Sequence, residues 1–256
     1  MENVSGYMID MDGTVYRGNE VIPGAPEFIE RIKAKNIPFV FLTNNSAWDR
    51  SHYYKKLTKM GFRISIDNIL TSTTATITYL KNHRKGKTVY PLGTPKFVKE
   101  ITDEGIPIDE KDPDIVLLAF DTTITYEKMN NAYQFLKKGK EFIATHPDDL
   151  CPTEKGYDID IGPFIRFFET MTGKKATVIG KPNPLMVKMA AETMNVDAKG
   201  MVMVGDRIYT DMRMAADSGI RSVMVLTGEA KRSDLKGSGI SPTSIVDSVD
   251  EILRAR

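Results

Sequence analysis

The chain has 256 residues, 41% of them hydrophobic and 27% charged, a composition typical of a globular protein with one large domain or two modest ones. Its 35 basic and 34 acidic residues leave a formal charge of +1, which argues against nucleic acid or an anionic membrane as a partner. Cys151 is the single cysteine, so no internal disulfide can form, and with no signal-like N-terminus and no apolar run of roughly 20 residues we expect a cytoplasmic protein.

Short apolar runs alternate with amphipathic stretches along the whole chain. In chain order, we predict strands at residues 7–9, 38–42, 68–70, 88–90, 115–119, 142–144, 176–178, 201–204, 222–226 and 245–246. Between them we predict helices that begin after Pro23-Gly24, then at 50–60, from 72, and at 94–104, 126–137, 164–171, 185–194 and 208–218, with one more near the C-terminus. Residues 145–162 are expected to be irregular. This alternation predicts parallel strands joined by crossover helices.

Polar side chains follow four of the predicted strands, at the points where those strands end. They are Asp10 with Asp12, Thr43 with Asn44 and Asn45, Lys181, and Asp206. Open parallel sheets bind ligands beyond the carboxyl ends of their strands, where the strand order reverses. Carboxylates gathered there would repel one another, so a divalent cation is the natural counter-charge, and oxygen ligands favour Mg²⁺. The histidines are scattered and show no zinc spacing: they are His52, His83 and His146.

Such a site suits the hydrolysis of a phosphate ester. A metal ion and Lys181 would neutralise the phosphoryl group, so that the carboxylate of Asp10 can attack phosphorus and form an aspartyl phosphate. Asp12 is placed to protonate the leaving oxygen and later to take a proton from water. Thr43 and the backbone N–H groups after it would hold the phosphate at the start of a helix.

These motifs, in this order, resemble the four signature motifs of the haloacid dehalogenase superfamily, and more narrowly its NagD-like, or p-nitrophenylphosphatase-like, phosphatases. The signature stretches are Asp10-Met11-Asp12-Gly13-Thr14, Thr43-Asn44-Asn45, Lys181-Pro182, and Gly205-Asp206 with Asp211. The narrower likeness is carried by Val21-Ile22-Pro23-Gly24-Ala25, Pro91-Leu92-Gly93-Thr94, Ala144-Thr145 and Gly180-Lys181-Pro182-Asn183-Pro184. The resemblance covers essentially the whole chain.

The resemblance implies roles for individual residues. Asp10 and Asp206 would bind Mg²⁺ through their side chains and Asp12 through its backbone carbonyl, with Asp211 supporting the site from behind. It also implies an α/β fold, in which a Rossmann-like, doubly wound parallel sheet forms the catalytic core and an α/β cap domain is inserted. We expect the core at 1–78 and 178–256 and the cap, which would set substrate specificity, at 79–177.

The expected activity is that of a Mg²⁺-dependent phosphatase for small phosphorylated metabolites. A sugar phosphate, a nucleoside monophosphate, phosphoglycolate and p-nitrophenyl phosphate are all candidate substrates. Two other functions stay open: a non-catalytic phosphometabolite sensor that uses the same pocket, and a signalling receiver that carries an aspartyl phosphate, although such receivers are about half this length. The oligomeric state is not readable from the sequence, and a homodimer is one option.

Two residues of the predicted cap have more than one interpretation. His146 stands where the family's Ala-Thr-Asn segment has asparagine, and it is either an ordinary loop residue or a substrate contact. Asp160, just before Gly162-Pro163, either accepts hydrogen bonds from the leaving group or caps the helix that starts there. Both lie in the cap, so they bear on the substrate rather than on the chemistry.

Overall fold

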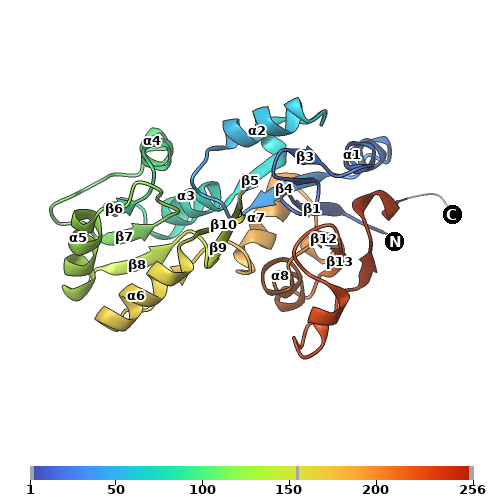
Figure 1. The fold of residues 1–256 in the computed structure, drawn as a ribbon. Helices are drawn as coiled ribbons and strands as arrows, with labels where there is room; N and C mark the ends of the chain where they lie inside the picture. Colours follow the sequence, from blue (N-terminus) through green and yellow to red (C-terminus); the bar gives the residue numbers. More distant parts are fainter. Residues whose placement is uncertain (1–2, 154–155, 254–256) are drawn as a thin grey trace. The chain divides into compact units, whose positions relative to one another are not determined.

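The computed structural model describes residues 3–153 and 156–253, whose contacts form two compact units (Figure 1). The first unit contains Met1–Thr43, Arg50–Leu70 and Lys181–Arg256, and the second contains Asn44–Asp49 and Thr71–Gly180. The predicted insert, 79–177, lies within the second unit. That unit begins earlier than the insert because helix α3 (Ser72–His83) packs against α4 (Pro95–Asp103).

The first unit is built on a six-stranded sheet with the order β14-β13-β12-β1-β4-β5. The strands are β1 (Gly6–Asp10), β4 (Phe39–Thr43), β5 (Ile69–Thr71), β12 (Met201–Gly205), β13 (Arg221–Val225) and β14 (Ser244–Val246). Strand β1 pairs in parallel with both β4 and β12, and β12, β13 and β14 continue the parallel pairing. The chain winds outward from β1 on one side and returns to β12 on the other, so the order reverses between β1 and β12, at the place where ligands bind in such sheets.

Helices of the first unit cover this sheet with their apolar faces. They are α1 (Ala25–Ala34), α2 (Arg50–Lys59), α7 (Leu185–Met194) and α8 (Arg213–Asp217), and a small hairpin of β2 (Tyr16–Arg17) and β3 (Glu20–Val21) follows β1. Proline in its first turn helps α1 to start, and Phe28, Ile29 and Ile32 are fully buried on one side of that helix. Tyr7 and Phe28 meet edge to face, with ring centroids 5.9 Å apart. Full burial of each such side chain stabilises the fold by about 1.5–3 kcal/mol, so the core fixes the sheet that carries the site.

The second unit has its own parallel sheet, with the order β11-β8-β7-β6. Its elements are α3, β6 (Val89–Leu92), α4, β7 (Ile115–Leu118), α5 (Tyr126–Lys137), β8 (Glu141–Ala144), β9 (Leu150–Thr153), β10 (Gly156–Ile159), α6 (Gly162–Thr172) and β11 (Thr177–Val178). A separate hydrophobic core, which includes Leu92, Leu118, Phe142 and Phe168, fills this unit. Both units are therefore α/β, and the predicted fold class is confirmed.

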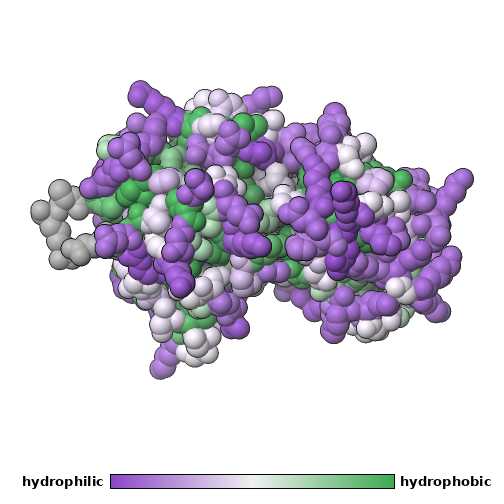
Figure 2. Space-filling view, turned by 180° about the vertical axis from the view of Figure 1, so that it is seen from behind, coloured by the Kyte–Doolittle hydropathy of each residue, from purple (hydrophilic) through white to green (hydrophobic). Residues whose placement is uncertain are grey.

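The structure departs from the sequence expectation at several places, and one is the last predicted helix, where the residues described up to 253 form only a 3₁₀ turn, η5 (Val249–Glu251). The stretch expected to be irregular contains an antiparallel hairpin, in which β9 pairs with β10. The expected helix at 208–218 divides into a π-helical turn, η3 (Ile208–Met212), and the short helix α8. Within the described residues, no helix is long and apolar enough to cross a membrane, and hydrophilic side chains occupy much of the face shown in Figure 2.

Candidate active site

Three buried aspartates of the first unit gather beside the point where its strand order reverses. Asp10 is the last residue of β1 and Asp206 directly follows β12, the strand paired with β1, so both lie at the same edge of the sheet. Asp211 lies in the π-helical turn that follows. One carboxylate oxygen from each residue lies within 4.8 Å of the others. A π-helical turn is rare and frequently occurs at a functional site.

The ammonium of Lys181 lies within this cluster and is only 3% exposed. It forms an ion pair with Asp10 and a second with Asp211, in which Nζ is 2.7 Å from Oδ1. Burial on its own would lower the pKa of Lys181, but the two carboxylates outweigh burial and raise its pKa above the ordinary lysine value. Lys181 is therefore a fixed positive charge beside Asp10.

One positive charge does not compensate the three carboxylates. Burial, reinforced by Asp10 and Asp211, raises the pKa of Asp206 to about 8. Burial also raises the pKa of Asp211, to about 6, although Lys181 opposes the change. Burial therefore disfavours the ionised form of both carboxylates, a cation bound among them would restore it, and an all-oxygen cluster of this kind fits a hard divalent cation. The acidic cluster is thus suited to hold a metal ion, as the sequence predicted.

Asp12 follows the nucleophile candidate in the loop beyond β1. The loop turns back at Gly13, whose φ of +84° lies in the left-handed region, and its N–H donates to the carbonyl of Tyr16 at 2.7 Å. Burial raises the pKa of Asp12, whereas Lys56 and Arg207 partly offset this change. A raised pKa favours the protonated carboxyl group, which is the form that a general acid requires.

The three consecutive polar residues that were predicted to hold phosphate do not all belong to the same unit. Thr43 ends β4 one residue past the pairing of Asp10 with Leu42, so it lies at the same sheet edge as Asp10. Asn44 and Asn45 belong to the second unit. The amide of Asn44 donates to Asp148 at 3.1 Å, and the side-chain oxygen of Asn45 accepts the N–H of Ala47 at 2.9 Å. Phosphate contacts from these two residues stay a prediction.

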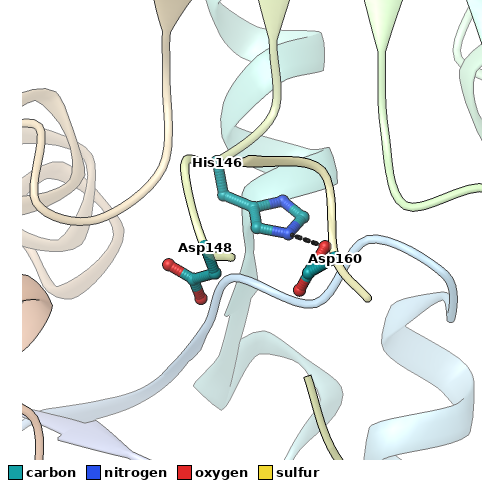
Figure 3. A group of neighbouring side chains, drawn as sticks. All are labelled: His146, Asp148 and Asp160. Atoms are coloured by element: carbon teal, nitrogen blue, oxygen red, sulfur yellow. Dashed lines mark hydrogen bonds and ion pairs between the residues drawn. The ribbon is translucent and has the colours of Figure 1, made fainter. Parts of the chain in front are cut away.

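His146 and Asp160 of the second unit are hydrogen-bonded to each other, and Asp148 lies beside them (Figure 3). His146 Nε2 and Asp160 Oδ1 are 2.8 Å apart, and the same oxygen accepts the N–H of Ile161 at 2.7 Å. Both side chains are buried, with exposures of 0% and 2%. Helix α6 has Ile161 at its N-cap position with no side-chain cap, so Asp160 does not cap it. Contact of either residue with substrate stays a prediction.

A segment that the sequence analysis did not single out also reaches the site. Residues 227–230 follow β13, the neighbour of β12, and the N–H of Glu229 donates to Asp206 Oδ2 at 2.7 Å. The signal in the sequence was weak, because Thr227-Gly228 after a strand reads as an ordinary turn. Only the sheet order shows that this strand end lies next to that of Asp206.

Comparison with known proteins places these features in a family. A model of haloacid dehalogenase-like hydrolases matches residues 7–107, and a second, HAD-hydrolase-like model matches residues 178–252. The chain is 32% identical to the acid sugar phosphatase of Staphylococcus saprophyticus, over 99% of this chain and 98% of that protein. It is 30% identical to the 5'-nucleotidase YutF of Bacillus subtilis, over 98% of each.

Solved structures agree with the sequence relatives. The 4-nitrophenylphosphatase of Thermotoga maritima is 39% identical, with a TM-score of 0.95 over 99% of this chain and 97% of that one. NagD from E. coli K-12 is 28% identical, with a TM-score of 0.90 over 98% of each chain. The family predicted from the motifs is therefore confirmed: the chain belongs to the haloacid dehalogenase-like hydrolases and stands with their NagD-like phosphatases.

Proposed function

We propose that the chain is a Mg²⁺-dependent phosphatase that hydrolyses small phosphate monoesters through an aspartyl phosphate on Asp10. That it is a phosphoric monoester hydrolase is confirmed by relatives named as phosphatases, which match it over nearly its full length. The observation that carries the finer proposal is the cluster at the sheet switch point, where Asp10, Asp206 and Asp211 gather and Lys181 pairs with Asp10 and Asp211.

The donor set suits magnesium. Asp10 and Asp206 would hold the ion through their carboxylates and Asp12 through its backbone carbonyl. Bound there, the ion would supply positive charge against the phosphoryl oxygens and so reduce their repulsion of Asp10. Asp211 is placed to act through Lys181, because its Oδ1 accepts the Lys181 ammonium and its Oδ2 accepts the N–H of Arg207 at 3.2 Å. This pair of bonds fixes the ammonium beside the nucleophile.

The proposed reaction has two displacements at phosphorus. In the first, an Asp10 carboxylate oxygen bonds to phosphorus while the ester P–O bond breaks, and protonated Asp12 gives its proton to the leaving oxygen. In the second, Asp12 takes a proton from water, whose oxygen bonds to phosphorus as the Asp10 acyl phosphate bond breaks. Inorganic phosphate leaves, and both aspartates return to their starting states. Lys181 and Thr43 would bind the phosphoryl oxygens throughout.

The substrate class follows from the relatives and from the site. The named relatives include a sugar phosphatase, a nucleotidase and a 4-nitrophenylphosphatase. We propose that this chain likewise accepts small phosphate monoesters, with sugar phosphates, nucleoside monophosphates and phosphoglycolate as candidates. A sensor without turnover would not need a half-buried proton donor, so the raised pKa of Asp12 favours the enzyme.

The experiment measures hydrolysis of 4-nitrophenyl phosphate and of a sugar phosphate by the wild type and two variants. Asp10→Asn should show no turnover with either ester, because it lacks the nucleophile. Asp12→Asn should lose about 10²–10⁴-fold in kcat/KM with the sugar phosphate and less with 4-nitrophenyl phosphate, because kcat/KM reports the first displacement and nitrophenolate departs without a proton. Chelator should abolish wild-type activity and Mg²⁺ should restore it. Full activity in excess chelator, or turnover by Asp10→Asn, would rule out the proposal.

A further inference from the structure

We propose that residues 227–230 form a positioning element of the metal site, which fixes the carboxylate of Asp206 relative to the loop that carries Asp10. The inference rests on the proposed function, since it assigns a purpose to the site described there. It is carried by contacts that lie entirely within the first unit. These contacts reach the carboxylate of Asp206, the backbone carbonyl of Asp206, and the loop beyond β1.

The first contact holds the carboxylate directly. The N–H of Glu229 donates to Asp206 Oδ2 at 2.7 Å, and the N–H of Ala230 donates to the Asp206 carbonyl at 3.3 Å. The segment therefore bonds both the side chain and the backbone of one residue. On the opposite oxygen, Oδ1, the hydroxyl of Thr14 lies 3.4 Å away. These bonds restrict rotation of the carboxylate and leave it oriented before any metal binds.

The second feature is the close packing of the segment on the same carboxylate. A Cβ atom at Gly228 would overlap Asp206 Oδ2, and so would a Cβ atom at Gly13. The carboxylate is thus enclosed by backbone at both positions. Gly13 also needs its left-handed φ, whereas Gly228 has no such conformation. A methyl group at Gly228 would therefore force the Asp206 carboxylate to move, and residue 228 needs no left-handed φ that alanine would disfavour.

The third feature ties the segment to the loop beyond β1. The hydroxyl of Thr227 donates to the carbonyl of Gly13 at 2.7 Å, and the Arg17 guanidinium donates to the carbonyl of Thr227. One short segment therefore contacts both strand ends that supply proposed ligands. The side chains of Arg207 and Glu229 also pair at 3.1 Å, but Glu229 is 56% exposed there, so the pair adds little. The positioning thus comes from Thr227, Gly228 and a peptide N–H.

The test compares Mg²⁺ binding by the wild type and three variants. Gly228→Ala adds one methyl group against Asp206. Thr227→Val removes the hydroxyl at nearly constant volume, and Thr227→Ser keeps the hydroxyl. Two readouts are taken for each: the Mg²⁺ concentration that gives half-maximal hydrolysis of 4-nitrophenyl phosphate, and the rise in Tm that Mg²⁺ causes without substrate. Gly6→Ala is the matched control, because its new methyl group meets mainly the flexible end of Met194, at 3.1 Å.

Gly228→Ala should raise the half-saturating Mg²⁺ concentration at least about tenfold, as loss of an outer-sphere support does, and should shrink the Mg²⁺-induced rise in Tm. Thr227→Val should raise it between about two- and tenfold, as loss of one hydrogen bond does, while Thr227→Ser and Gly6→Ala stay at the wild-type value. If Gly228→Ala does not fold, the comparison of Thr227→Val with Thr227→Ser tests the inference.

Wild-type Mg²⁺ half-saturation in Gly228→Ala and Thr227→Val, with or without a lower Tm, would overturn the inference and leave the proposed function standing. That result would mean that residues 227–230 support the fold but do not position the Asp206 carboxylate for the metal. A wild type that needs no metal would overturn both. The two failures are therefore distinguished by the wild-type measurement alone.

Discussion

Replacing Lys181 with methionine keeps most of the side-chain volume and removes the buried ammonium. In the wild type, Nζ is 2.7 Å from Asp211 Oδ1 and also pairs with Asp10. Attraction between unit charges at that distance is about 6 kcal/mol at an effective dielectric constant of about 20. Because burying the ammonium costs part of this, we expect Lys181→Met to lower the free energy of unfolding by about 3–5 kcal/mol near pH 8 without metal.

The stability lost in Lys181→Met should depend on pH, and the direction of that dependence follows from the pKa values of the carboxylates. Their unfolded-state pKa is about 4, and without Lys181 the folded-state pKa of Asp211 must rise further above that value. A carboxylate with a raised folded-state pKa leaves stability intact below the unfolded-state pKa. Stability is then lost as the pH rises toward the folded-state pKa. Lys181→Met should therefore be only slightly destabilised near pH 4, and most destabilised at pH 8.

Urea unfolding in chelator at several pH values measures this effect. Lys188→Met on α7 is the control, because its side chain is 70% exposed and lies 3.9 Å from Glu192. It should change the free energy of unfolding by less than about 1 kcal/mol at every pH. A loss for Lys181→Met that is below about 1 kcal/mol at pH 8, or that does not vary with pH, would refute the charge balance derived for the site.

Three further predictions follow from the same geometry. Without metal, the wild type should lose stability as the pH rises toward the Asp206 pKa of about 8, so Mg²⁺ should raise Tm more at pH 8 than at pH 6; an equal rise would contradict this. Ca²⁺ should compete with Mg²⁺ yet support little turnover, because its looser coordination misplaces the nucleophile; full Ca²⁺ activity would argue otherwise. Asp160→Ala should lower Tm, because its carboxylate accepts bonds from His146 and Ile161. An unchanged Tm with at least about a tenfold loss of kcat/KM for the natural substrate alone would instead assign Asp160 to substrate recognition.

The sheet strands and most helices could be predicted because apolar periodicity and strand-end polarity are local signals. Residues 7–9 and 201–204 are almost purely apolar, which is typical of strands buried on both faces of a parallel sheet. The hairpin of β9 and β10 gave no such signal, since Pro152 interrupts it and each of its strands has only four residues. The π-helical turn was missed because its apolar spacing resembles that of an ordinary helix.

Some contacts of the candidate site could likewise be predicted from the sequence, and others could not. Asp10 and Asp206 could be placed together because each follows a predicted strand, and strand ends share one edge of a parallel sheet. Lys181 follows β11, which belongs to the sheet of the second unit, so the shared edge that we expected does not account for its ion pair with Asp10, and only the family resemblance brought it to the site. The bond between His146 and Asp160 joins residues 14 positions apart in a stretch without clear periodicity. Sequence alone does not give such a contact. The Thr227–Gly228 turn likewise acquires meaning only once the sheet order brings β13 beside β12.

The central claim is that phosphate passes through a covalent bond to Asp10, and trapping that bond tests it most directly. Asp12→Asn should be mixed with 4-nitrophenyl phosphate and Mg²⁺, quenched in acid, and reduced with borohydride before peptide mass spectrometry. Nitrophenolate leaves without a proton, but water attack is slowed in this variant, so the acyl phosphate accumulates. We predict conversion of residue 10 to homoserine in proportion to the nitrophenolate released in the first turnover. An unmodified Asp10 despite that burst, or reduction at another aspartate, would contradict the account.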